Sequence, residues 1–266
     1  MTRVAAVVLV VCSVAPFAWF ASASFKGPRE IAQRRPTLVP LEPTLDGYRG
    51  AVDKGLAGWM LNSLIVATAT TLVTLPLAAG AAYALSRTRM RGRRILLGLV
   101  LAASMFPQVT LAHTLYGMLQ SAGLVNTRAG PVFPYVSLTL PLAIWILASF
   151  FREIPAELEE AARIDGAGPV RTLVRVFLPV AAPGVFTAAI LTFIYAWNEF
   201  FFALVLLTGN DVRTLPPGIA TMPGQYTFPW GEIAAACVLA TAPLLAAVLL
   251  LQRRIVSGLT AGAVKQ

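Results

Sequence analysis

The chain is poor in charge, and in acidic residues above all. Only 12% of its 266 residues are charged, with 12 Asp or Glu against 21 Lys or Arg. Soluble domains carry about 25% charged residues, whereas 57% of this chain is hydrophobic and its mean hydropathy is +0.73. A soluble fold could not bury so much apolar surface, so we expect an all-α membrane protein whose solvent is lipid.

Residues that carry catalysis or bind metals are also scarce. Cys12 and Cys237 lie in apolar runs without a CxxC motif or a Cys/His cluster, which argues against a metal site and a disulfide framework. The single histidine, His113, lies in an apolar stretch, where an interior hydrogen-bonded residue is a better interpretation than a catalytic base. No GxGxxG, GxxxxGK[ST] or GxSxG motif occurs, so we identify no nucleotide site or cofactor in this chain.

The net charge of +9 comes from basic residues scattered between apolar runs. Nucleic-acid binding would need them gathered on one polar face, so no nucleic acid is expected as a partner. An excess of Lys and Arg in cytoplasmic loops explains the charge instead.

Long runs without charge divide the chain into candidate membrane-spanning helices. About 20 mostly apolar residues cross a bilayer, and six runs suffice for this. Small residues four apart, Gly80 with Ala84 and Gly184 with Ala188, permit close helix packing in lipid, although ordinary filler explains any single pair equally well. We place the spans in one transmembrane domain, 1–266, at about 4–23, 60–85, 95–119, 130–151, 180–207 and 233–252.

The first run has a second interpretation. Arg3, the apolar run and Ala-Ser-Ala at 21–23 resemble a signal peptide with its cleavage site. Cleavage would leave five helices and place the new N-terminus outside. The run is long for a signal peptide and many spans follow it, so we favour a retained helix.

Basic residues in short loops predict the orientation. Residues 87–94 contain five arginines, so this loop is predicted to be cytoplasmic. Alternation then places both termini, the tail 253–266 and the loop 152–178 on the cytoplasmic side. Residues 26–54 disagree, because they hold six basic residues on the predicted outer side.

Five of the 12 acids lie within residues 152–179. Pro155 suits the first turn of a helix, Gly166 and Gly168 can end it, and Pro169 can begin another. The first helix has a modest apolar stripe of Ile154, Leu158, Ala161 and Ile164, with Glu157, Glu159, Glu160 and Arg163 on its remaining faces. From the residues alone, a solvated loop and a docking helix for a partner with a basic groove are equally good interpretations.

Three stretches carry a resemblance to a known family. Residues 159–184, EEAARIDGAGPVRTLVRVFLPVAAPG, resemble the EAA motif of bacterial ABC importer permeases. WNEF at 197–200 and the C-terminal stretch 230–265 are further matches. Together they are similar to the MalG-like permease subunits of carbohydrate importers of the maltose and trehalose type, over nearly the whole chain.

The resemblance implies the type I ABC importer permease (MetI-like) fold, with six transmembrane helices and a cytoplasmic coupling helix, in a bacterial plasma (inner) membrane. A sugar such as trehalose or maltose would pass between this chain and a second, related permease subunit. Two copies of a cytoplasmic ATPase, which would hold ATP and Mg²⁺, would drive import, and an extracytoplasmic sugar-binding (lipo)protein would deliver the sugar. The chain would thus be a transporter subunit and not an enzyme.

The resemblance also implies how the ATPase is contacted. The coupling helix would sit in a cleft of the ATPase, where Glu160 matches a motif glutamate that commonly pairs with an ATPase arginine. Gly166 matches the motif glycine, where a side chain could prevent the turn from fitting. The expected coupling residues are Glu160, Ala161, Ala162, Asp165, Gly166 and Ala167, and the C-terminal tail would add Ser257, Gly258, Leu259 and Thr260.

Glu199 is the only acid within a predicted span. Intramembrane carboxylates are costly and usually face a bundle interior or a cavity. Glu199 and Asn198 would line the pathway or fix a gate; a structural hydrogen bond to a neighbouring helix is the alternative. A sugar site also needs aromatic surfaces together with polar groups, which adds Trp197, Tyr195, Gln108 and Tyr116 as candidates.

Other functions fit the sequence less well. An ion-coupled secondary transporter usually needs several intramembrane ionisable groups, and a membrane enzyme needs a nucleophile, base or metal cluster. A permease for another solute, such as glycerol phosphate or an amino sugar, is the nearer alternative.

Overall fold

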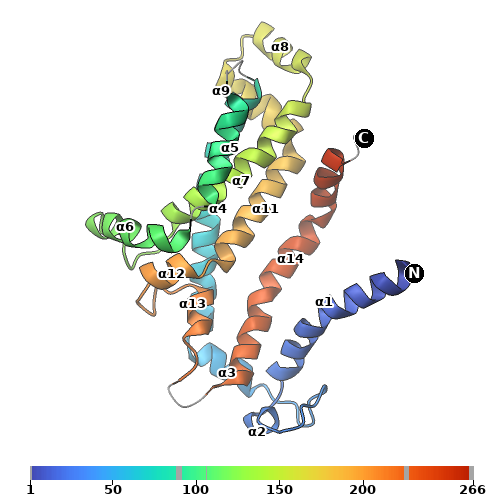
Figure 1. Ribbon diagram of the computed structural model, residues 1–266, viewed down its shortest axis with the longest axis vertical. Coiled ribbons are helices and arrows are strands. Elements are labelled where there is room, and N and C mark those ends of the chain that lie inside the picture. The colour runs from blue at the N-terminus through green and yellow to red at the C-terminus, as the bar shows by residue number, and fades with distance from the viewer. Residues whose placement is uncertain (1, 88–91, 106, 225–227, 264–266) are drawn as a thin grey trace. The chain divides into compact units, whose positions relative to one another are not determined.

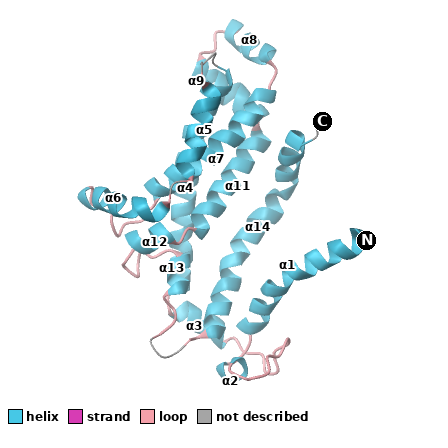
Figure 2. Ribbon diagram, viewed as in Figure 1, coloured by secondary structure: helices cyan, strands magenta, loops and turns pink. Residues whose placement is uncertain are grey.

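Figure 1 shows the computed structural model of the chain, which describes residues 2–87, 92–105, 107–224 and 228–263. Every regular element among these residues is a helix (Figure 2). The helices follow the apolar runs of the sequence, because a backbone in lipid must satisfy its hydrogen bonds within its own segment. The expected all-α class is therefore confirmed for the described residues.

The chain forms two compact units. The first comprises Met1–Asn62 with Gly209–Ala246, and the second comprises Ser63–Thr208 with Ala247–Gln266. The first unit contains α1 (Thr2–Ser24), α2 (Pro28–Ile31), α3 (Asp46–Asp53), the start of α4 (Leu56–Arg87), α13 (Leu215–Ala220) and the first half of α14 (Trp230–Ala263).

Polar contacts connect distant segments within the first unit. The side-chain amide of Asn62 donates hydrogen bonds to the carbonyl oxygens of Asp211 and Arg213, both at 2.9 Å. The ammonium group of Lys54 lies 2.7 Å from the carboxylate of Glu232. These contacts fix the segment after residue 208 and the start of α14 to the segment in which α4 begins.

The second unit is a bundle in which α4, α5, α7 and α11 pack against one another (Figure 1). Its core is lined by small and branched apolar side chains, among them Ala82, Ile144, Leu147 and Ala188. Its elements after α4 are α5 (Arg93–Ser104), α6 (Gln108–Ser121), α7 (Val132–Glu153), α8 (Ala156–Ile164), α9 (Pro169–Thr172), the π-helix η1 (Leu173–Phe177), α10 (Leu178–Val180), α11 (Ala182–Asn198) and α12 (Phe201–Leu206).

At Gly184, the backbone of α11 closely approaches a side chain of α7. A Cβ atom at Gly184 would lie 2.5 Å from the ring of Phe150. At Gly80, by contrast, no described atom lies within 4 Å of the corresponding position. Close packing of small residues therefore explains Gly184, whereas Gly80 faces open space in this chain.

Several described helices are suited to a membrane. Val4–Ser24, Leu56–Arg87 and Val132–Glu153 are long and apolar enough to cross it. Pro169–Val180 and Ala182–Asn198 qualify together, although they are bent by 86° at their junction, and Trp230–Ala246 is a shorter apolar helix. These helices support a multi-pass protein, and the count of six spans stays a prediction.

Two predicted spans differ from continuous helices. Residues 95–119 are divided at Pro107 into α5 and α6, and residues 180–207 are divided at Glu199 and Phe200 into α11 and α12. Pro107 lacks an amide hydrogen and precedes the first turn of α6 in an extended conformation. Glu199 is also extended and ends α11. Apolar composition predicts where a chain can enter lipid, but not where its backbone changes direction.

Candidate functional site

The predicted coupling segment forms a helix, a glycine turn and a second helix. Gly166 ends α8 with a φ of 73°, a conformation that glycine adopts without strain. The amide of Ala167 donates to the carbonyl oxygen of Ala162 at 2.9 Å, and the amide of Gly166 to that of Arg163 at 3.0 Å. These two bonds form a Schellman motif, which satisfies the last carbonyl groups of α8. α9 begins at Pro169, so both predicted helix boundaries are confirmed.

The apolar stripe expected on α8 does not face the bundle. Glu159 and Ala162 are the buried residues of this helix, whereas Leu158 is 42% and Ile164 86% exposed. Ile154, which precedes α8, is buried. The inner face of α8 meets polar groups of α4, which favour a carboxylate over an aliphatic side chain. Of the predicted coupling residues, Ala162 is buried, Ala167 is partly buried, and the exposed ones are Glu160, Ala161, Asp165 and Gly166.

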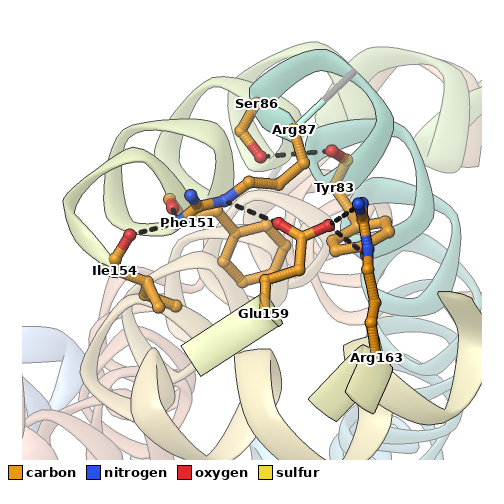
Figure 3. Close-up of polar contacts among 7 residues, drawn as sticks. All are labelled: Tyr83, Ser86, Arg87, Phe151, Ile154, Glu159 and Arg163. Atoms are coloured by element: carbon orange, nitrogen blue, oxygen red, sulfur yellow. Dashed lines mark hydrogen bonds and ion pairs between the residues drawn. The ribbon is translucent and has the colours of Figure 1, made fainter. Parts of the chain in front are cut away.

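Glu159 connects α8 to the bundle (Figure 3). Its side chain is only 9% exposed. A guanidinium nitrogen of Arg163 donates to Oε1 of Glu159 at 2.6 Å, and the hydroxyl of Tyr83 donates to the same oxygen at 3.2 Å. Nε of Arg87 lies 3.8 Å from Oε2. The carboxylate is thus placed between one arginine of its own helix and one arginine of α4.

Arg87 is the last residue of α4, and its side chain also contacts the C-terminal end of α7 (Figure 3) and the π-helix η1. Its guanidinium donates to the carbonyl oxygen of Phe151 at 2.6 Å and to that of Ile154. It also lies 4.8 Å from the ring centre of Phe177 in η1. The last carbonyl groups of a helix have no partner within it and carry partial negative charge. Arg87 therefore caps the C-terminal end of α7 while it faces Glu159.

The contact between Arg87 and Glu159 brings two segments to the same end of the second unit. One is the end of α4 at Arg87, where the arginine-rich sequence starts, and the other is the acidic segment. Both were predicted to be cytoplasmic, and the shared position agrees with that prediction. The orientation itself stays a prediction.

Sequence reasoning missed Tyr83, Arg87 and Glu159 as members of this site. One signal could have indicated the glutamate: Glu159 and Glu160 are adjacent, and adjacent residues of a helix point about 100° apart. Two acids in succession therefore cannot both face the same partner. Nothing local to α4 indicates that Tyr83 and Arg87 meet α8, since they precede Glu159 by more than 70 residues.

The pathway candidates form a second, partly connected group. Both oxygens of the Glu199 carboxylate accept backbone amides at the start of α12, from Phe202 at 3.0 Å and from Ala203 at 3.2 Å. The side-chain amide of Gln108 donates to the hydroxyl of Tyr195 at 2.8 Å. Tyr195 lies about one helical turn before Glu199, at the C-terminal end of α11. The structure therefore brings Gln108, Tyr195 and Glu199 together where α11 ends.

The other pathway candidates lie apart from these three. Asn198 is exposed and donates to the carbonyl oxygen of Ile194 in its own helix at 2.8 Å. Trp197 is buried against the ring of Phe193, with ring centres 5.9 Å apart. Tyr116 lies on α6, about two helical turns beyond Gln108. The hydrogen bonds of Glu199 agree with a structural role, although its partner is the next helix of its own segment and not a neighbouring one.

Two further predictions concern metals and the C-terminus. In the part of the chain that the structure describes, no group of three or more His, Cys, Asp or Glu side chains could hold a metal ion. The predicted tail contacts fall in α14, and their side chains lie outside the described part of the chain: Ser257, Gly258, Leu259 and Thr260.

Curated relatives cover the chain almost from end to end. The trehalose/maltose transport system permease protein MalG of Thermococcus litoralis is 42% identical over 98% of this chain and 95% of its own length. The trehalose transport system permease protein SugB of Mycobacterium tuberculosis is also 42% identical, over 94% and 92%. The sulfoquinovosyl glycerol transport system permease protein SmoH of Agrobacterium fabrum is 40% identical, over 98% and 92%.

Solved structures show the same fold. A bacterial ABC transporter involved in the import of the acidic polysaccharide alginate contains a chain that superimposes with a TM-score of 0.80 at 23% identity. The match covers 95% of this chain and 94% of that one. A second structure, the alginate transporter in complex with a periplasmic protein bound to an alginate pentasaccharide, has a TM-score of 0.68.

The family comparison agrees with these likenesses and confirms the resemblance to carbohydrate ABC importer permeases. Residues 73–261 match the family described as the inner membrane component of binding-protein-dependent transport systems. Proteins of this kind are transporter subunits and not enzymes, and a partner ATPase hydrolyses the ATP. The chain belongs to the family of inner membrane components of binding-protein-dependent transport systems, as a multi-pass permease subunit.

Proposed function

We propose that this chain imports a sugar and that α8 is the coupling helix through which a cytoplasmic ATPase drives the transport. One observation carries the second statement. α8 presents an outward face of mixed character, where Glu160 lies one helical turn from the exposed apolar side chain of Ile164. Exposed apolar surface rimmed by charge is typical of a protein interface.

The geometry gives Glu160 and Gly166 different roles in this contact. Glu160 is exposed and free to pair with a cation of the ATPase, while the neighbouring glutamate holds the helix from behind. Gly166 has a positive φ, and no described atom lies within 4 Å of the position that a Cβ atom would take there. The space beside Gly166 is therefore available to a partner surface.

The importer would contain several other chains. A second, related permease subunit would form the other half of the pathway, and two ATPase subunits would bind ATP and Mg²⁺. An extracytoplasmic binding protein would deliver the sugar. The C-terminal residues 257–260 would add a second contact with the ATPase. With both termini cytoplasmic, α8 and this tail would face the same compartment.

The names of the relatives support a disaccharide such as trehalose or maltose as the sugar. Other relatives are named for sulfoquinovosyl glycerol and diacetylchitobiose. A permease for such another solute is therefore the second candidate. Gln108, Tyr195 and Glu199 are the polar residues of this chain that we assign to the pathway, where α11 ends.

Transport would follow from movement of α8. Closure of the ATPase dimer would bring the coupling helices of the two permeases together, and the bundle would change from an inward-facing to an outward-facing packing. Such a change requires an interface with two discrete packings. ATP hydrolysis in the partner would reset the bundle.

Substitutions at Glu160 and Gly166 test the proposed coupling helix. Glu160→Ala should reduce copurification of the ATPase and sugar uptake, because it removes the exposed charge that the ATPase would bind. A loss of roughly tenfold in affinity corresponds to about 1.4 kcal/mol, a typical value for a charge-assisted contact. Unchanged copurification and uptake would contradict the proposal.

Gly166 allows steric fit to be separated from backbone strain. Asn adopts positive φ far more readily than other residues, so Gly166→Asn preserves the turn but adds a side chain. Gly166→Asn should therefore still insert in the membrane and fail to bind the ATPase. If Gly166→Asn binds the ATPase normally, the glycine serves only the turn.

A further inference from the structure

We propose that the pair formed by Glu159 and Arg87 transmits the movement of the coupling helix to the bundle. This inference rests on the proposed function of α8, and it concerns a step after the ATPase has bound. Glu159 and Arg87 are positioning residues: neither would touch the ATPase, ATP or the sugar.

Few side chains connect α8 to the rest of its unit. Of its nine residues, only Glu159 and Ala162 are buried. Alanine buries little area and has no polar group, so it provides neither direction nor strength. The directional contact between α8 and the bundle is therefore the Glu159 carboxylate, with Tyr83 and Arg87 as its partners on α4.

Arg87 distributes this contact over the bundle. Its side chain is 12% exposed, and it joins the end of α4 to the last carbonyl groups of α7 and to the ring of Phe177. Phe177 in turn packs edge-on against Tyr83 and Phe151, with ring centres 4.9 Å and 5.4 Å away. A displacement of the carboxylate thus acts on α4, α7 and η1 together.

The contact itself is incomplete in this structure. Nε of Arg87 is buried and has no hydrogen-bond partner among the described residues, and it lies 3.8 Å from Oε2 of Glu159. A shift of α8 by roughly an ångström would bring the two atoms within hydrogen-bonding distance. Arg163, whose side chain is 67% exposed, holds the other oxygen from the side of α8. The pair can therefore tighten or loosen as α8 moves, which a rigid apolar contact could not do.

Hydrogen–deuterium exchange of the complete importer, with both permeases and both ATPases, tests this inference. Exchange is compared without nucleotide and after trapping with ATP, Mg²⁺ and vanadate. In the wild-type importer, trapping should change exchange in α8 and also in residues 78–87 of α4 and 147–153 of α7. In Glu159→Gln, the change in α8 should persist, while that in the α4 and α7 segments falls by roughly fivefold or more, the lower range of coupling between linked sites.

A matched control isolates the pair between helices. Glu157→Gln removes the same charge from an exposed glutamate of the same helix. This variant should retain the nucleotide-dependent change in α4 and α7. If Glu159 is only structural, Glu159→Gln should raise hydrogen–deuterium exchange equally without nucleotide and after trapping. The difference in exchange between the two states would then equal that of the wild-type importer.

Arg87→Lys provides a second variant if Glu159→Gln does not assemble. Lysine keeps the positive charge but lacks the planar group that bonds to two carbonyl oxygens while it faces a carboxylate. It should show the same selective loss in α4 and α7. If the nucleotide-dependent change in exchange of α4 and α7 is undiminished in either variant, this inference is overturned, while the proposed function of α8 still stands. A wild-type importer in which α8 does not respond to nucleotide would contradict the proposed coupling helix as well.

Discussion

Glu159 and Glu160 are neighbours of one chemical type, yet they face opposite environments. Glu159 is buried between two arginines, and Glu160 is exposed. Because a buried carboxylate is costly unless it is paired, Arg87 and Arg163 are what allow Glu159 to lie inward. The two glutamates thus have different roles: Glu159 holds α8 against the bundle, and Glu160 is available to a partner.

Gly184 allows a prediction at the same scale. Gly184→Ala should destabilise the protein by about 1–3 kcal/mol, the usual effect of overpacking, because the new methyl group would lie 2.5 Å from the ring of Phe150. A lower midpoint of thermal denaturation in detergent would confirm it. Phe150→Leu in the same chain should restore part of the loss.

Gly80→Ala is the matched control for this substitution. It also adds one methyl group to a helix glycine of the second unit, but no described atom lies within 4 Å of that position. The denaturation midpoint should stay unchanged or rise slightly, since alanine is the better helix former. An equal loss in both variants would mean that contact with Phe150 is not the cause.

At the scale of the elements, helices within long apolar runs end or bend at particular residues. Pro107 stands between α5 and α6, Glu199 between α11 and α12, and Pro179 follows the π-helix. Proline removes one backbone hydrogen bond and crowds the preceding turn, which favours such irregular turns. The 86° bend before α11 then lets α9 and η1 lie across the end of the bundle, beside α8.

Glu199 determines how α12 begins, which yields a prediction about this element. Glu199→Gln leaves one side-chain oxygen for two backbone amides, because the new NH₂ group can only donate. One amide would lose its acceptor, so the variant should be less stable by about 1–3 kcal/mol. Thermal denaturation in detergent measures this, with Asn198→Ala as a control at the exposed neighbouring position. An unchanged midpoint in Glu199→Gln would show that these bonds contribute little.

At the scale of the whole molecule, the predicted orientation can be tested by labelling single cysteines in intact cells. In a chain without Cys12 and Cys237, Glu153→Cys at the end of α7 should resist a membrane-impermeant thiol reagent. Leu38→Cys should react with it, because Leu38 is 80% exposed in the loop predicted to be outside. Their reactivities should exchange in inside-out vesicles. The opposite pattern would show that the basic residues of 26–54, and not the arginines of 87–94, determine the orientation.

The sequence by itself determined the class of protein, the apolar segments, the family and the short polar helix with its glycine end. These features depend on composition, run length and the backbone preferences of glycine and proline, all of which are local. Gly166 and Pro169 could be assigned correctly because the conformations they favour do not depend on distant neighbours.

Only the tertiary structure decided which glutamate faces the bundle, which glycine permits close packing and where two apolar runs bend. Each of these depends on residues that are distant in sequence. Tyr83 and Arg87 lie more than 70 residues before Glu159 and contact its carboxylate. Phe150 lies against Gly184, whereas no described side chain lies against Gly80. Burial, charge pairing and steric contact depend on which residues surround a side chain. For residues distant in sequence, those contacts form only when the helices pack.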